Sequence, residues 1–96
     1  PPRTRRLIYA PAFIGKQICF TATSQIVFSA NDRHSGVVQT MCRFSPEEEF
    51  KPCPSPLTLP ESFNQNCRHC ITLEYYSVDR AENQEKIHRE QFGFFR

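Results

Sequence analysis

Residues 70–78 read CITLEYYSV, and this stretch decides the fold class. Its apolar residues Ile71, Leu73 and Tyr75 fall on alternate positions. This period of two is typical of a β-strand with one buried face. The pattern predicts a strand over residues 70–78 and, by extension, a β-rich protein.

Three further segments alternate in the same way: residues 17–22, 25–30 and 37–44. Asn, Asp and Gly in residues 31–36 form the strongest turn signal of the chain. We therefore expect residues 25–44 to form a β-hairpin. Residues 79–94 allow a helix that starts at Asp79, but their apolar residues form no helical stripe. A turn near residues 81–84 and a closing strand over 86–94 fits better.

Two stretches predict irregular structure. Residues 1–14 combine prolines with a basic cluster, and we expect an extended basic arm. Residues 50–66 hold four prolines, which predict a long loop that Cys53 and Cys67 tether. A short helix is expected to start at Ser45, because Pro46 suits a first helical turn and residues 47–49 are glutamates.

Taken together, residues 1–96 predict a single domain that is all-β or β-rich. The expected architecture is a small disulfide-stapled β-sandwich or open barrel of about five to six short strands, with at most one short helix. A hydrophobic content of 39% and a charged content of 23% exclude a disordered tail, and no apolar run is long enough for a membrane span.

Cysteine is abundant for so short a chain. The five candidates for disulfides are Cys19, Cys42, Cys53, Cys67 and Cys70. This density predicts a secreted, oxidised protein whose signal peptide has been removed. An odd count leaves one thiol unpaired, which would permit a homodimer through that cysteine.

Cys67-Arg68-His69-Cys70 is the sharpest local motif. A Cys-x-x-Cys pair can bind zinc, with Cys42, Cys53 or His69 as further ligands, in an intracellular interaction module. The spacing also occurs in redox-active dithiols, although these open a helix and this motif opens a strand. Structural disulfides remain the preferred interpretation, and neither a metal nor a cofactor is expected.

The net charge of +2 is too small to indicate a nucleic-acid partner. Two histidines, or one with a glutamate, can cleave RNA by acid–base catalysis, so His34, His88, Arg89 and Glu90 define a ribonuclease-like hydrolase as an alternative function. No spacing demands it, and no catalytic residue is assigned.

The preferred hypothesis is a small secreted binding protein, of the ligand, receptor-module or pathogen-effector type, that recognises another protein, in the extracellular space or in a host cell. Arginine and aromatic side chains are enriched at protein interfaces. The interface candidates are Arg3, Arg5, Arg6, Tyr9, Tyr76, Arg89, Phe94 and Phe95. An edge strand can also bind a partner strand, and residues 3–9 and 87–95 are the two segments predicted to do so.

Overall fold

Nine strands and no helix make up the part of the chain that this computed structural model describes, residues 2–31, 36–45, 49–60 and 65–95. The strands are β1 (Arg3–Tyr9), β2 (Ala12–Ile14), β3 (Gln17–Phe20), β4 (Gln25–Asn31), β5 (Val37–Ser45), β6 (Lys51–Pro52), β7 (Leu57–Thr58), β8 (Cys67–Asp79) and β9 (His88–Phe94). The all-β prediction is confirmed. The strands are more numerous than expected because the arm and the proline-rich loop contribute short ones.

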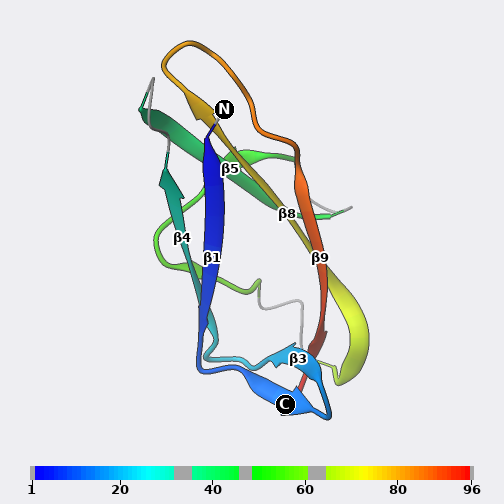
Figure 1. The fold of residues 1–96 in the computed structure, drawn as a ribbon. Helices are drawn as coiled ribbons and strands as arrows, with labels where there is room; N and C mark the ends of the chain where they lie inside the picture. The colour runs from blue at the N-terminus through cyan, green and yellow to red at the C-terminus, as the bar shows by residue number, and fades with distance from the viewer. Residues whose placement is uncertain (1, 32–35, 46–48, 61–64, 96) are drawn as a thin grey trace.

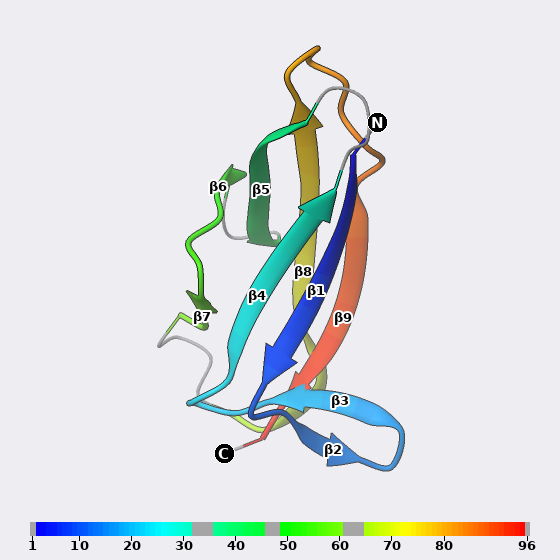
Figure 2. The ribbon, with the colours of Figure 1, turned by 60° about the vertical axis from the view of Figure 1, so that its left-hand side comes forward.

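The strands form two sheets that face each other (Figures 1 and 2). The smaller sheet has the order β1-β4-β7, and the larger has the order β2-β3-β9-β8-β5-β6. All neighbours are antiparallel except β3 and β9, which run parallel. The result is a sandwich rather than a closed barrel.

The core lies between the sheets and is built from the inward positions that alternation predicted. Its buried side chains are Phe20, Ile26, Cys42, Phe44, Leu57, Ile71, Leu73, Tyr75, Phe92 and Phe94. Residues 71, 73 and 75 of β8 all belong to it, as the sequence pattern requires. Phe20 and Phe92 pack with ring centroids 4.6 Å apart and so join β3 to β9.

The predicted hairpin over residues 25–44 is wrong. β4 pairs with β1 along its whole length, and β5 pairs with β8, so β4 and β5 belong to different sheets. β1 is the stronger partner for β4 because it offers seven matched positions without a bulge. Residues 32–35 lie outside the described part, and with them His34.

The segment expected as an extended arm is extended, but it belongs to the fold as β1 and β2. The expected loop contains β6 and β7, and Pro52 occupies the outermost strand of the larger sheet, where a missing N–H is tolerated. β5 continues to Ser45, where a helix was expected to start; residues 46–48 lie outside the described part.

The closing strand is confirmed, because β8 and β9 form an antiparallel hairpin. The helix alternative for residues 79–92 is excluded. β9 lies between β3 and β8 in the strand order, but β3 pairs with it only at Gly93 and Phe94. Within the described residues, the expected edge over residues 87–95 is therefore closed only near its C-terminal end. β1, by contrast, is the outermost strand of the smaller sheet.

Candidate functional site

Polar side chains join the two sheets where β1 approaches β8 and β9; we call this region the seam. The Arg6 guanidinium donates from Nε to Glu90 Oε1 at 3.0 Å and from its terminal nitrogen to Oε2 at 2.7 Å. The Tyr75 hydroxyl donates to the same carboxylate at 2.6 Å. Glu90 is therefore held from both sheets at once.

These contacts shift the ionisation of all three groups. Burial alone would raise the pKa of Glu90, but the hydrogen bonds from Arg6 and Tyr75 and the charge of Arg6 outweigh burial and lower it. The hydrogen bond to Glu90 raises the pKa of the Arg6 guanidinium. Burial, together with the bond to Glu90, raises the pKa of the Tyr75 hydroxyl far above its ordinary value of 10.0. At neutral pH the triad is an ion pair with a neutral phenol.

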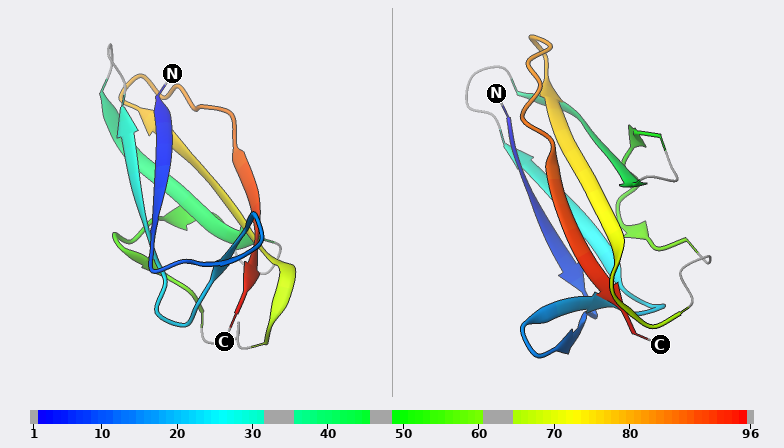
Figure 3. Two further views of the ribbon diagram at one scale, coloured as in Figure 1. Left: turned by 60° about the horizontal axis from the view of Figure 1, so that its bottom comes forward. Right: turned by 90° about the vertical axis from the view of Figure 1, so that its right-hand side faces the viewer.

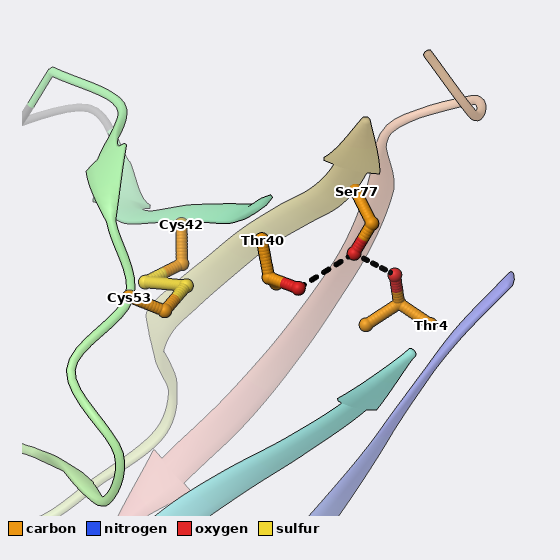
Figure 4. The surroundings of a disulfide bond; sticks show 5 residues. All are labelled: Thr4, Thr40, Cys42, Cys53 and Ser77. Carbon is orange, nitrogen blue, oxygen red and sulfur yellow. Dashed lines mark hydrogen bonds between the residues drawn. A yellow bond between two sulfur atoms is a disulfide. The ribbon is translucent and has the colours of Figure 1, made fainter. Parts of the chain in front are cut away.

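Glu85 is a second centre of the seam, and its carboxylate is buried. It accepts the backbone N–H of Thr4 at 3.1 Å, the Thr4 hydroxyl, and the backbone N–H of Ser77 at 2.7 Å. The Ser77 hydroxyl lies 2.7 Å from both Thr4 Oγ1 and Thr40 Oγ1 (Figure 4). This chain of hydroxyls connects β1, β8 and β5 and satisfies polar groups that burial would otherwise penalise.

His88 completes the seam. Its Nε2 lies 3.0 Å from Glu85 Oε2, and its ring stacks on Tyr75 with centroids 4.8 Å apart. Arg89 points to the opposite face of the sheet, where its Nε lies 4.0 Å from Glu74 Oε2. Arg89 therefore lies on the opposite face of the sheet from His88 and Glu90, with which the hydrolase alternative groups it. Within the described residues no group of three or more His, Cys, Asp or Glu side chains could hold a metal ion.

The outer face of β1 is a different kind of surface. Thr4, Arg6 and Ile8 point inward, so Arg3, Arg5, Leu7 and Tyr9 point out and are exposed. Neither Arg3 nor Arg5 makes an ion pair with a described residue. Leu7 is 55% exposed and Tyr9 is 51% exposed. Two unpaired cations are thus followed by two exposed apolar side chains on one strand face.

More apolar side chains are exposed around the end of the sandwich where β1 stops. Phe13 and Ile14 lie in β2, next to a turn in which Gly15 has a φ of 62°. Phe95 follows β9, and its N–H bonds the carbonyl of Phe20 on β3. Figures 1 and 3 show β2, β3 and the C-terminus at this end. We call these exposed residues together the docking face: Arg3, Arg5, Leu7, Tyr9, Phe13, Ile14 and Phe95. Phe13 and Ile14 are consecutive in β2 and point to opposite sides of it.

The structure separates the residues predicted for an interface. Arg3, Arg5, Tyr9 and Phe95 lie in the docking face. Arg6 turns inward to Glu90, and Phe94 is only 2% exposed, so its expected exposure is wrong. Phe94 is buried because alternation along β9 places it, like Phe92, in the core.

Tyr76 and Arg89 lie on the outer face of the larger sheet, away from the docking face. There the Phe50 ring packs edge-on against Tyr76 at 5.0 Å, and the Arg43 guanidinium lies over Phe50 at 4.4 Å and bonds Glu74 at 2.9 Å. These groups already satisfy one another, which makes this face a weaker candidate for a partner.

Sequence reasoning missed Leu7, Phe13 and Ile14 as surface residues, and Glu85 as a buried one. An arm was expected over residues 1–14 because residues 3–9 read RTRRLIY, in which polar and apolar residues do not alternate; their burial alternates only in the folded sheet. No pattern marks Glu85, because a glutamate within the polar segment 79–86 is typical of solvent exposure.

Four cysteines form two disulfides, Cys42–Cys53 and Cys67–Cys70. The first ties the proline-rich loop to β5, as the tether prediction requires for Cys53. Cys67 bonds Cys70 instead of closing the loop, so the tether prediction is wrong for Cys67. Cys19 is the unpaired cysteine and is buried, which keeps its thiol away from a second chain. With the four paired, the zinc alternative loses its thiolate ligands.

Comparison of the chain with protein-family models, with curated proteins and with solved structures found no match. Among the described residues, no helix has the length and apolar character to cross a membrane. The disulfides indicate an oxidising environment. Function must therefore be argued from the surface and the seam alone.

Proposed function

We propose that this chain is a small secreted binding protein that acts by protein–protein interaction through the docking face. One observation carries the proposal. Of the six large hydrophobic side chains exposed in the described residues, five lie on β1, on β2 or directly after β9: Leu7, Tyr9, Phe13, Ile14 and Phe95. Figure 2 shows the end of β1, β2 and the C-terminus at the same end of the sandwich. Exposed apolar side chains that gather at one place are typical of contact surfaces, whereas scattered ones are ordinary.

The seam supports a binding role over the hydrolase alternative. A catalytic carboxylate needs room to reach a substrate, yet Glu90 is occupied by Arg6 and Tyr75, and Glu85 by Thr4 and Ser77 besides His88. Such saturated groups fix the position of β1 against β8 and β9. The seam therefore holds the docking face rigid, which reduces the entropy lost on binding.

The test is site-directed photo-cross-linking in the extracellular fluid of the source. A photoreactive amino acid replaces Tyr9 in one protein and Lys86, which is exposed at the other end, in a control. We expect one protein to cross-link at position 9 and not at 86. That protein, once purified, should bind wild type at least tenfold more tightly than the double variant Tyr9→Ser/Phe13→Ser.

Ile87→Ser is the matched control, because Ile87 is 46% exposed but lies outside the docking face. It should bind the captured protein as wild type does. Equal binding by wild type and by Tyr9→Ser/Phe13→Ser would contradict the proposal.

A further inference from the structure

The backbone groups on the outer edge of β1 indicate which kind of partner can bind there. The N–H of Thr4 bonds Glu85, so it points away from β4. Along a strand, backbone groups alternate between the two neighbours. The N–H and C=O groups of Arg6 and Ile8 therefore also point to the outer edge, and no described residue bonds them there. β1 offers a partner strand four unpaired backbone groups at these two residues.

The rest of this edge is protected. At Thr4 the Glu85 carboxylate takes the N–H, as native sheets do to prevent unwanted pairing. At Ala10 the backbone leaves the strand with a φ of 56°. The open stretch between them pairs with about five extended residues, and a segment of seven reaches beside Arg3 without a backbone bond at Thr4.

The outward side chains of β1 determine which side chains of that segment fit beside them. Residues of an added strand lie beside Arg3, Arg5, Leu7 and Tyr9 on the same face. Arg3 and Arg5 make no ion pair with any residue that the structure describes, so acidic side chains fit beside them. Leu7 and Tyr9 are half exposed, so apolar side chains fit beside them.

Charge also discriminates between a foreign segment and a second copy of this chain. Pairing of two β1 strands would leave the Arg3 and Arg5 guanidinium groups of both copies without a carboxylate, whichever way the second strand ran. An acidic segment neutralises the same groups. The acidic segment is therefore the favoured occupant.

We propose that β1 binds an extended segment of a partner protein by strand addition, with two acidic residues at alternate positions beside Arg3 and Arg5 and two apolar residues beside Leu7 and Tyr9. This inference rests on the proposed binding function and specifies its partner. Backbone bonds to Arg6 and Ile8 supply the affinity, and the outward side chains supply the specificity.

The test uses fluorescein-labelled peptides ETETVTV and VTVTETE, which present the same side chains in the two chain directions, and KTKTVTV as the charge-reversed probe. Anisotropy titrations should show that one acidic peptide binds and that KTKTVTV does not. Arg3→Glu/Arg5→Glu should weaken binding at least tenfold. Arg80→Glu/Lys86→Glu changes the charge equally at exposed residues outside the docking face and should leave affinity within twofold.

Strand addition also requires that every second N–H group of the peptide backbone bonds β1. Methylation of alternate peptide nitrogens should abolish binding in one set of positions, which faces β1, and spare it in the other. Equal effects of both sets would overturn strand addition, as would failure of both acidic peptides to bind. A dimer in sedimentation velocity that Arg3→Glu/Arg5→Glu strengthens would make a second copy the occupant and overturn the acidic one.

The two proposals fail separately. If the peptides do not bind while Tyr9→Ser/Phe13→Ser still loses the captured protein, strand addition is wrong and the binding function stands. If neither the peptides nor the captured protein respond to any docking-face substitution, both are wrong.

Discussion

The hydroxyl of Tyr75 lies 2.6 Å from Glu90 Oε1, and Arg6 binds both oxygens of that carboxylate from the opposite sheet. Arg6 and Glu90 each have 28% of the side chain exposed, so water screens the ion pair only in part. The Arg6 guanidinium also lies 5.6 Å from the Phe92 ring. One carboxylate thus links the strand that forms the docking face to the core of the larger sheet.

Glu90→Gln should therefore destabilise the protein. The substitution removes the charge that Arg6 and Tyr75 both bind, and hydrogen bonds to charged groups contribute about 1.5–3 kcal/mol. We expect a loss of about 2 kcal/mol in the free energy of unfolding, measured by urea denaturation. Glu82→Gln, at an exposed residue, is the control and should change stability by less than about 0.5 kcal/mol. Equal stability of the two variants would show that the ion pair contributes nothing.

The lowered pKa of Glu90 predicts an acid dependence of stability. Because the folded state binds the Glu90 proton more weakly than the unfolded state, its contribution is complete above the unfolded pKa and is lost as pH falls through the folded pKa. The stability difference between wild type and Glu90→Gln should be largest near neutral pH and shrink below pH 4.5. Urea denaturation at several pH values measures it, and a difference that stays constant down to pH 2 would contradict the shift.

Tyr75 predicts the opposite dependence at alkaline pH. Its raised pKa means that the folded state keeps the phenol proton, so this contribution is present below pH 10.0 and is lost as pH rises above it. Tyr75→Phe keeps the buried ring but loses one hydrogen bond, at a cost of about 1 kcal/mol near neutral pH. Above pH 10.0 the stabilities of wild type and variant should converge. If they instead diverge, Tyr75 ionises more easily in the folded state than in the unfolded one.

Much of the fold could be predicted because alternation is a local signal. β8 and β9 each carry their buried face in their own sequence, so both strands and the turn between them were predicted correctly. The partner of a strand is not local. β4 and β5 are separated by a strong turn, yet β4 pairs with β1, because an antiparallel match over seven residues outweighs proximity along the chain.

The candidate site was less predictable for the same reason. Exposure of Tyr9 and burial of Phe94 follow from strand faces, which depend on where each strand begins. Arg6 and Arg5 are indistinguishable by residue type, but one points to Glu90 and the other to solvent. The role of Glu85 requires Thr4 and Ser77, which lie 81 and 8 residues away in the chain. Only the assembled sandwich brings them together.

The two disulfides should differ in how much they contribute to the free energy of unfolding. Cys42–Cys53 closes a loop with a sequence separation of 11, and Cys67–Cys70 closes one with a separation of 3. In the chain-entropy model, a longer loop gives more stabilisation, about 3 kcal/mol against about 1.5 kcal/mol. Cys42→Ala/Cys53→Ala should therefore lower the free energy of unfolding more than Cys67→Ala/Cys70→Ala does. The reverse order in urea denaturation would contradict the model.

The same pairing predicts the mass of the protein. Two disulfides remove four hydrogens, so the intact mass should lie about 4 Da below that of the fully reduced chain. Alkylation without reductant should label no cysteine in the folded protein and one, Cys19, after denaturation, because its thiol is buried. Labelling of Cys19 in the native protein would show that the thiol is accessible after all.

Gly93 is the glycine whose replacement should cost most. A Cβ there would lie 2.6 Å from the Cys67 carbonyl oxygen, 2.7 Å from Cys19 Sγ and 2.9 Å from the Arg68 carbonyl oxygen. Two of these atoms belong to the backbone of β8, which its pairing with β9 holds in place, so the clash cannot be relieved by a rotamer change. Gly93→Ala should lower the free energy of unfolding by about 1–3 kcal/mol, the cost typical of overpacking.

Two variants separate crowding at Gly93 from other causes. Gly15→Ala meets nothing within 4 Å and carries only the strain of a φ of +62°, about 1–2 kcal/mol, with no change in the packing of β9. Cys19→Ala/Gly93→Ala removes the sulfur but leaves both carbonyls, so it should recover little of the loss. Full recovery in that double variant, measured by urea denaturation, would show that the Cys19 thiol and not the β8 backbone requires glycine at position 93.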